Sequence, residues 1–273
     1  MNILEEIAGK TRIRVAEQKE TVSLEALRLK ALSLAREEEI LDKSFAAALR
    51  KPGISAICEV KKASPSKGVI AEHFPYVEIA KGYEAAGASA ISVLTEPYYF
   101  QGDSRYLAEI KEAVTVPLLR KDFVVDSYQI YEAKCIGASA VLLICSILDE
   151  ETLRCYIHIA ESLKMDALVE AHDEKEVRMA LKAGASIIGV NNRDLKTFQV
   201  DVKNSLRLRK LVPSSVLFVS ESGIHTREDV ERLEEAGVDG VLIGETLMRS
   251  GSVKETLQGL LGKGSPGKAH ETM

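Results

Sequence analysis

The sequence lacks several features that define whole classes of protein. Its 273 residues contain no tryptophan, and aromatic residues make up only 5% of the chain. No apolar run approaches the roughly 20 residues that a membrane-spanning helix needs. The first ten residues carry acids where a secretion signal has a positive and then an apolar region. We therefore expect a cytoplasmic protein that does not contact a membrane.

Cysteine pairs and an excess of positive charge are also missing. Neither the four cysteines nor the histidines show metal-ligand spacing, which predicts reduced, mostly buried thiols and no metal site. The net charge of −5 gives no sign of nucleic-acid binding. An anion would have to be held by local groups rather than by a global positive field. The residues concerned are Cys58, Cys135, Cys145, Cys155, His73, His158, His172 and His225.

What the sequence does contain is an internal repeat. Four segments each end a helical pattern at a glycine and then start an apolar strand. The spacings between the glycines are 50, 47 and 53 residues. Glycine takes the left-handed conformation that ends many helices. A period of about 50 residues is long enough for two βα units. The glycines are Gly87, Gly137, Gly184 and Gly237.

Further apolar segments lie between the repeats, at residues 116–124, 166–171 and 214–223, and another, at 54–62, precedes the first repeat. They bring the expected strands to eight, alternating with amphipathic helices such as 150–164. Alternating strands and helices with continuous apolar strands predict a parallel sheet. Eight such units in about 200 residues predict a closed (β/α)₈ barrel, with an open doubly wound sheet as the alternative.

The segments outside the barrel are assigned by composition. Residues 1–48 are helical by pattern, heavily charged and anchored by apolar residues, so we expect an N-terminal helical extension packed on the barrel. The barrel itself spans 54–250, within a single domain of residues 1–262. Residues 263–273 are polar and rich in glycine, which predicts a disordered tail. The apolar anchors are Ile3, Leu4, Ile7, Val15, Leu24 and Leu27.

Polar residues recur at the ends of the expected strands. Side chains at positions i and i+2 of a strand share a face, so several charged or amide side chains point to the barrel interior. Any one of them is also explained by a structural ion pair. Five strands that do this at the same end instead predict an acid/base site in the barrel mouth. The residues are Glu59, Lys61, Lys121, Glu170, Asn191 and Glu221.

A phosphate site is predicted at the ends of the last two strands. "SESGI" (220–224) and "LIGE" (242–245) occupy the positions where many barrels bind phosphate. Gly223 and Gly244 allow backbone N–H groups to approach an anion closely, and Arg193 and the lysines of 61–68 add positive charge. Phe100 either belongs to the core or covers an apolar ring of a substrate.

Several long motifs resemble one family in order along the chain. They are "EVKKASPSKG", "LTEPYYFQGD", "LLRKDFVVDSYQIYEA", "ALVEAH", "GVNNRDL", "VSESGI" and "VLIGETLM". With them the sequence resembles the indole-3-glycerol-phosphate synthase family to about residue 250. The resemblance implies a cofactor-free carboxy-lyase of tryptophan biosynthesis. The expected reaction converts 1-(2-carboxyphenylamino)-1-deoxyribulose 5-phosphate into indole-3-glycerol phosphate, carbon dioxide and water.

The resemblance also implies site residues, position by position. Catalytic roles fall to the six strand-end residues Glu59, Lys61, Lys121, Glu170, Asn191 and Glu221. Substrate contacts fall to Ser64, Phe100, Phe123, Arg193 and Ser222. The phosphate is expected at the backbone of Gly223, Gly244 and Glu245.

The chemistry assigns roles to these groups. We expect Lys121 to be the general acid at the ketone and Glu170 its acid/base counterpart. Glu59 would stabilise the developing positive charge, and Lys61 would lie near the substrate carboxylate or the departing hydroxyl. Residues 64–68 form either a lid or a plain connection to a helix beginning near Pro75.

Two alternative functions stay open at this point. One is a Schiff-base aldolase, which needs a strand-end lysine of lowered pKa. The other is a non-catalytic barrel that binds a phosphosugar. In each case the expected partner is a small phosphorylated molecule, and the expected assembly is a monomer or a weak homo-oligomer.

Overall fold

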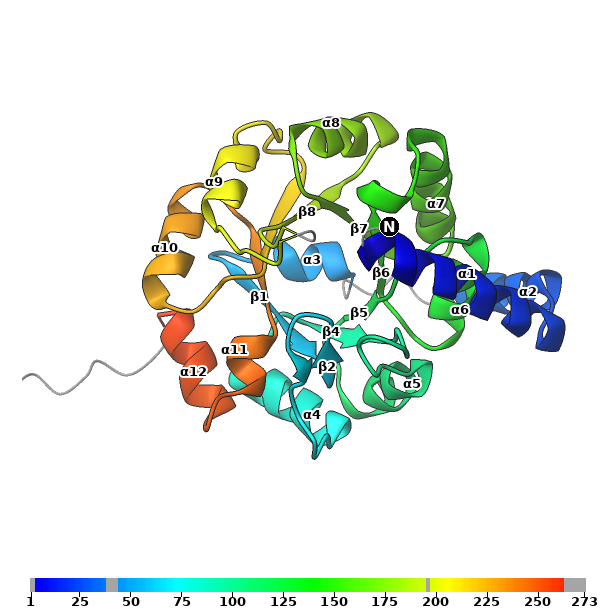
Figure 1. Ribbon diagram of the computed structural model, residues 1–273, viewed down its shortest axis with the longest axis horizontal. Coiled ribbons are helices and arrows are strands. Elements are labelled where there is room, and N and C mark those ends of the chain that lie inside the picture. Colours follow the sequence, from blue (N-terminus) through cyan, green and yellow to red (C-terminus); the bar gives the residue numbers. More distant parts are fainter. Residues whose placement is uncertain (1–2, 38–43, 195–196, 263–273) are drawn as a thin grey trace, which may run out of the picture.

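A closed barrel of parallel strands forms the centre of the molecule (Figure 1). The computed structural model describes residues 3–37, 44–194 and 197–262. Within these ranges eight strands close the barrel through the pairing of β10 with β1, which confirms the predicted fold class. The predicted tail at 263–273 lies outside the described residues. The strands are β1 (Ser55–Val60), β4 (Ala90–Leu94), β5 (Leu118–Lys121), β6 (Ala140–Ile144), β7 (Asp166–Ala171), β8 (Ile187–Asn191), β9 (Leu217–Glu221) and β10 (Gly240–Ile243).

Helices surround the strands, and their ends carry recognisable signals. Several begin at an Asp or Thr whose side chain accepts a backbone N–H, as at Asp149 and Thr226. The four predicted helix-ending glycines all have positive φ, between 77° and 99°. The surrounding helices are α4 (Tyr76–Ala86), α5 (Ser104–Ala113), α6 (Ser127–Cys135), η1 (Cys145–Ile147), α7 (Glu150–Ser162), α8 (Glu174–Ala183), α9 (Lys203–Arg209), α10 (Arg227–Glu235), α11 (Glu245–Met248) and α12 (Val253–Leu260).

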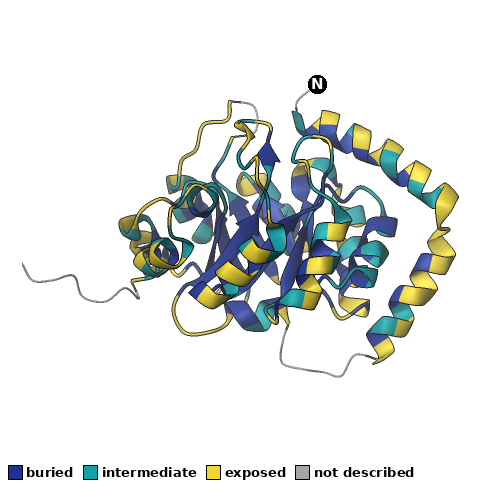
Figure 2. Cartoon of the chain, turned by 90° about the horizontal axis from the view of Figure 1, so that it is seen from below, coloured by how far each residue is buried: buried dark blue, intermediate teal, exposed yellow. Residues whose placement is uncertain are grey.

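Three helices precede the barrel: α1 (Ile3–Thr21), α2 (Leu24–Glu37) and α3 (Phe45–Leu49). Figure 2 shows that the outer faces of α1 and α2 are exposed while their inner faces are buried. α2 packs on α6, and Arg14 of α1 makes two hydrogen bonds of 2.9 Å to Asp122. The extension is therefore attached directly to the residue that follows Lys121.

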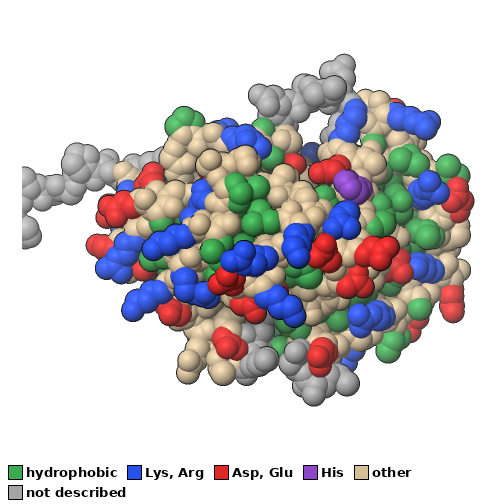
Figure 3. All heavy atoms as spheres, turned by 90° about the horizontal axis from the view of Figure 1, so that it is seen from above, with side chains coloured by type: hydrophobic (Ala, Val, Ile, Leu, Met, Phe, Trp, Pro, Cys, Tyr) green, Lys and Arg blue, Asp and Glu red, His purple; other side chains and the backbone are tan. Residues whose placement is uncertain are grey.

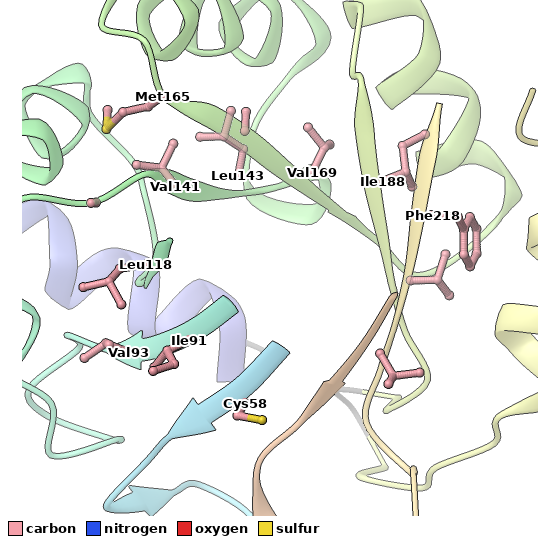
Figure 4. Packing of buried hydrophobic residues seen from close by; sticks show 14 of the residues in the cluster. Cys58, Ile91, Val93, Leu118, Val141, Leu143, Met165, Val169, Ile188 and Phe218 are labelled. Atoms are coloured by element: carbon pink, nitrogen blue, oxygen red, sulfur yellow. The ribbon is translucent and has the colours of Figure 1, made fainter. Parts of the chain in front are cut away.

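Successive strand residues point alternately outward and inward, which produces two apolar layers. The outward layer packs between strands and helices; Figure 4 shows members such as Val141, Leu143 and Phe218. Burying such a side chain fully stabilises the fold by roughly 1.5–3 kcal/mol. The inward layer fills the barrel and is closed at the bottom by Phe45 and Leu49 of α3. Its strand residues include Ile57, Leu119, Leu142, Leu168, Ile187, Val219 and Leu242.

A small antiparallel hairpin follows β1, made of β2 (Ala63–Ser64) and β3 (Gly68–Val69). It leads to α4, whose first residue directly follows Pro75, as expected.

None of the helices in the described ranges is long and apolar enough to cross a membrane. On the face shown in Figure 3, acidic and basic side chains are intermixed.

The four cysteines all lie in the described ranges and are free thiols. Cys58 and Cys145 are buried, and burial raises the pKa of both thiols. Cys135 is only partly buried, and Cys155 is exposed because it lies on the outer face of α7. The expectation of mostly buried thiols is therefore right for two of the four residues.

Candidate active site

The six predicted acid/base residues line one cavity in the barrel mouth, with a volume of about 120 Å³. Lys121 Nζ lies 3.4 Å from Glu170 Oε2 and 3.7 Å from Glu221 Oε2. Lys61 Nζ lies 2.5 Å from Glu59 Oε1. The alternation of strand side chains brings these groups together, because each lies two or four residues beyond an inward apolar or glycine position.

Burial and charge act against each other at these groups. Burial opposes ionisation of Glu59, yet Lys61 and Lys121 outweigh it and hold the pKa of this carboxyl below its usual value. Burial also opposes the charge of Lys121, but Glu170, Glu221 and Glu59 together raise the pKa of its ammonium. Lys121 is therefore protonated in the empty site, which is the form that a general acid needs.

The two carboxyls beside Lys121 differ in protonation. Burial raises the pKa of Glu221 to about 8, and repulsion by Glu170 and Glu59 adds to it against the attraction of Lys121. Burial acts on Glu170 in the same direction, but Lys121 and His172 lower its pKa to about 2. The proton goes to Glu221 because Glu170 lies closer to Lys121 and directly beside His172, so the site holds one neutral acid and one carboxylate side by side.

Two glycines make room for these carboxyls. A Cβ on Gly189 of β8 would lie 2.2 Å from Glu221 Oε1, and a Cβ on Gly244 would lie 2.6 Å from Glu59 Oε1 and 3.1 Å from Lys61 Nζ. Gly244, predicted to contact phosphate, thus also leaves space for the Glu59–Lys61 pair. Any side chain at these positions would displace a carboxyl of the site.

Asn191 connects the carboxylates to the neighbouring loop. Its Oδ1 accepts hydrogen bonds of 3.0 Å from the Ser222 hydroxyl and from the Arg193 backbone N–H. Its side chain also hydrogen-bonds Glu170 and so favours the ionised form. Ser222 has φ of 69°, a conformation that non-glycine residues rarely adopt. The neighbouring Asn192 amide hydrogen-bonds the Ser222 carbonyl at 3.0 Å and holds this conformation.

One end of the cavity is apolar and aromatic. The rings of Phe100 and Phe123 lie with centroids 6.2 Å apart, and both line the cavity. Ile3, Leu4 and Ile7 of α1 line it too. They were expected only to anchor the extension to the barrel, so the position of α1 across the mouth gives them a second role.

The other end opens into a second cavity of about 390 Å³, lined by the predicted phosphate residues Gly223, Gly244 and Glu245. Lys61 and Arg193 line both cavities, so the two form one continuous cleft. Gly223 has φ of 83°, and a Cβ there would lie 2.5 Å from Val200 Cγ1. These positions allow the backbone to approach an anion beside two cationic side chains.

The hairpin after β1 covers this cleft. Ser64 and its neighbours Pro65 and Ser66 line the first cavity, and Lys67 lines the second. Lys67 Nζ lies 3.5 Å from Glu245 Oε1, which links the hairpin tip to the start of α11. Each residue predicted to contact substrate or phosphate therefore lines one of the two cavities.

The sequence interpretation missed two ionisable side chains next to the site. His172 lies beside Glu170, with Nε2 3.3 Å from Glu170 Oε1, although the histidines were read as scattered. Asp122 is fully buried between Arg14 and Arg120, directly after Lys121. The spacing rule used for Glu59 and Lys61 also relates Glu170 to His172, so that signal was present in the sequence.

The cationic state of Lys121 bears on the aldolase alternative. A Schiff-base lysine must lose its proton to attack a carbonyl, and a lowered pKa favours this. The pKa of Lys121 is shifted in the opposite direction by its three carboxyl neighbours.

Among the described residues, no group of three or more His, Cys, Asp or Glu side chains is arranged to hold a metal ion.

Comparison with known proteins identifies relatives over nearly the full length. A family model described as indole-3-glycerol phosphate synthase matches residues 4–260. The indole-3-glycerol phosphate synthase of Ruminiclostridium cellulolyticum is 55% identical over 260 residues, which cover 95% of this chain and 99% of the relative. The enzyme of the same name from Endomicrobium trichonymphae is 53% identical over 258 residues, covering 94% and 99%.

Solved structures of low sequence identity share the fold. The 3-hexulose-6-phosphate synthase of Salmonella typhimurium has a TM-score of 0.64 at 14% identity and covers 77% of this chain and 98% of its own. The thiamine phosphate pyrophosphorylase of Pyrococcus furiosus has a TM-score of 0.57 at 16% identity, covering 76% and 93%. These likenesses support the barrel architecture alone.

Proposed function

This chain belongs to the indole-3-glycerol phosphate synthase family and catalyses its carboxy-lyase reaction in tryptophan biosynthesis, and we propose that Lys121 and the carboxyls around it carry out the proton transfers. Family membership favours ring closure over the aldolase and the phosphosugar-binding barrel. The division of labour among the site residues follows from the geometry of the cleft.

The substrate, 1-(2-carboxyphenylamino)-1-deoxyribulose 5-phosphate, matches the two ends of the cleft. Its aromatic ring lies against Phe100 and Phe123 at the apolar end. Its phosphate lies against the backbone at Gly223 and Gly244, with Arg193 nearby. The ketone between them then lies at the level of the buried charges.

The reaction needs two protons and releases one. An aromatic carbon attacks the ketone carbon, a carbon–carbon bond forms, and the ketone oxygen takes a proton. The bond to the carboxylate breaks, and its electron pair restores the aromatic ring as carbon dioxide leaves. The new hydroxyl departs as water with a second proton, while the methylene carbon beside nitrogen loses one. The balance is an uptake of one proton per turnover when the substrate carboxylate is ionised.

The residues divide these transfers. Lys121 donates to the ketone oxygen, and Glu170 accepts the carbon-bound proton. Glu59 stabilises the positive charge that develops on the anilino nitrogen, since a preorganised carboxylate in a buried cleft acts strongly on nearby charge. Lys61 assists departure of the hydroxyl. Glu221, neutral below about pH 8, presents an O–H donor beside them.

One observation supports this proposal most directly: Lys121 lies within ion-pair distance of two carboxyls that differ in protonation. The test follows carbon dioxide release and indole fluorescence in the same single-turnover reaction. Lys121→Ala should block both signals, because ring closure precedes decarboxylation. Lys61→Ala should release carbon dioxide before indole forms. The roles are exchanged if Lys61→Ala blocks both signals and Lys121→Ala blocks only the second.

The proposal also covers the oligomeric state of the enzyme and its cellular compartment. The residues that line the cleft already supply each of the groups assigned a role above, so the proposed active form is a monomer or a weak homo-oligomer. The free thiols support a reducing compartment such as the cytoplasm. Activity per chain that stays constant on dilution, with sedimentation measured in parallel, is the expected result. A loss of activity as an oligomer dissociates would contradict it.

A further inference from the structure

His172 occupies a partly buried position directly behind the carboxylate of Glu170. It follows β7, two residues after Glu170, so both side chains leave the same face of the strand. Its Nε2 lies 3.3 Å from Glu170 Oε1, and its side chain is 18% exposed. His172 lines a neighbouring cavity, which shares Asn191 and Arg193 with the cavity in the barrel mouth. The imidazole thus lies between the reaction cleft and this second space.

The opposite side of the imidazole is held just as firmly. Its Nδ1 lies 3.1 Å from Glu176 Oε2, and the same oxygen accepts the His172 backbone N–H at 2.8 Å. Ser146 Oγ hydrogen-bonds Glu176 at 2.7 Å and lies 3.3 Å from Nδ1. The ring therefore has a fixed orientation with one carboxylate at each nitrogen. A carboxylate oxygen within 3.3 Å of each nitrogen favours the doubly protonated, cationic form of the ring.

We propose that His172 is a positioning residue for the known reaction: as an imidazolium clamped by Glu176, it orients Glu170 and keeps that carboxylate ionised and ready to accept a proton. This deepens the mechanism proposed above and rests on Glu170 being the base. Within the cleft, Asn191 also hydrogen-bonds Glu170 and Lys121 is shared between Glu170 and Glu221, so His172 adds a cation on the side of Glu170 away from Lys121's second partner.

The electrostatics around the ring agree with a permanent cation. Burial opposes the charge, but Glu170 and Glu176 raise the pKa of His172 to about 10. The charge acts in turn on both carboxyls of the cleft, lowering the pKa of Glu170 and opposing the rise at Glu221. The groups that face His172 or its partners are Glu170 on β7, Glu176 and Asp173 at α8, Ser146 after β6, Lys121 on β5, Glu221 on β9 and Asn204 on α9.

The first variant is His172→Gln, with His158→Gln as the matched control. His158 has a similar contact to Glu161, 3.3 Å from Nδ1 to Oε2, but on the exposed face of α7. We expect His172→Gln to lower kcat about tenfold or more, because Glu170 loses its fixed orientation. The acid limb of kcat/KM should also move up by about one pH unit or more, since an opposite charge has been removed. His158→Gln should match wild type.

The second variant, Glu176→Gln, leaves the imidazole in place and removes its outer carboxylate. The pKa of the His172 ring should then fall by about one unit or more, and activity should decline as the pH rises through 8–9. Nuclear magnetic resonance titration of the His172 ring gives a readout that does not depend on activity. In wild type it should titrate near pH 10, far above an ordinary histidine.

These measurements separate failure of this proposal from failure of the mechanism. The Glu170→Gln variant should bring the His172 midpoint down even if Glu170 proved not to be the base. In that background, adding His172→Gln should cause little further loss of kcat if His172 acts through Glu170. A ring that titrates near pH 6.5 in wild type would overturn the proposal. So would a Glu176→Gln profile identical to wild type, which decides the matter if His172→Gln does not fold.

Discussion

The two ends of the barrel interior are built from the same strands but hold opposite kinds of side chain. At the bottom, α3 presses Phe45 and Leu49 against inward residues such as Leu217, and all three are buried and apolar. Along β9 the inward-facing residues continue through Val219 to Glu221. Glu221 carries an ionisable carboxyl and is only 1% exposed. One end is a packed core, and the other is a buried cluster of ionisable groups.

The difference separates stability from function. Apolar residues at the bottom gain free energy from burial, whereas buried ion pairs are often no more stabilising than apolar residues of similar volume. The ionisable groups of the mouth therefore contribute little to the free energy of unfolding, and substitutions there should change activity more than folding. Substitutions at the bottom should do the reverse.

The largest effect is expected at Lys121. Lys121→Ala should lower kcat by about 10²-fold or more with a smaller change in KM, because a general acid acts in the transition state. Lys121→Arg keeps the positive charge among the carboxyls but cannot give up its proton near neutral pH. We expect the Arg variant to stay folded and inactive. Activity within a few-fold of wild type in either variant would move the acid role to another residue.

The matching experiment at the bottom is Phe45→Ala. Phe45 is fully buried in the inward apolar cluster, so its truncation should lower the free energy of unfolding by about 3–5 kcal/mol. The folded fraction should keep a kcat within about twofold of wild type. Denaturant titration and kinetics at low temperature measure the two quantities. A large loss of kcat in folded enzyme would mean that the two ends are coupled.

Much of this arrangement could be predicted from the sequence. The repeat and its glycines indicated the barrel because helix ends and strand lengths are local properties. The i, i+2 spacing then predicted that Glu59, Lys61 and Glu170 enter the mouth, because strand alternation needs no knowledge of partners. The same rule applied to His172, but a histidine just beyond a strand was assigned to a loop.

Other features depend on contacts that no local pattern reports. The position of α1, and so the role of Leu4, depends on the pairing of Arg14 with Asp122, which lie 108 residues apart in sequence. The need for glycine at 189 arises from the Glu221 side chain on the next strand. The opposite protonation of Glu170 and Glu221 depends on distances to Lys121 and His172, which only the folded chain defines.

Within the mouth, the phosphate end should be separable from the proton-transfer end. Gly223→Ala should raise KM about tenfold with little change in kcat, because phosphate binding contributes to ground and transition states alike. Gly244→Val should raise KM and also lower kcat, since its side chain would displace Glu59 and Lys61. Competitive inhibition by inorganic phosphate should weaken in both variants. Unchanged inhibition would place the phosphate elsewhere.

A smaller effect is expected on the stability of the mouth itself. The raised pKa of Glu221, about 8, means that the folded enzyme holds a proton which the unfolded chain releases above its ordinary pKa near 4.5. Stability contributed by this group therefore falls as the pH rises from about 4.5 to 8. Glu221→Gln cannot titrate, so its melting temperature relative to wild type should rise by a few degrees between pH 5 and 8. A constant difference would mean that Glu221 is ionised throughout.

The smallest effect concerns how the two ends are closed. α3 closes the bottom with buried apolar contacts, whereas the mouth is covered by the hairpin of residues 63–69, linked to α11 by Lys67 and Glu245. That ion pair is partly exposed and so contributes at most about 1 kcal/mol. Such a weak link fits a lid that opens to admit substrate and release product.

Trypsin should cut after Lys67 in the empty enzyme and more slowly with a non-reactive substrate analogue bound. Glu245→Gln should speed cutting of the empty enzyme a few-fold. Equal rates in all three samples would make the hairpin a fixed connection, and the mouth would then be as permanently shaped as the bottom.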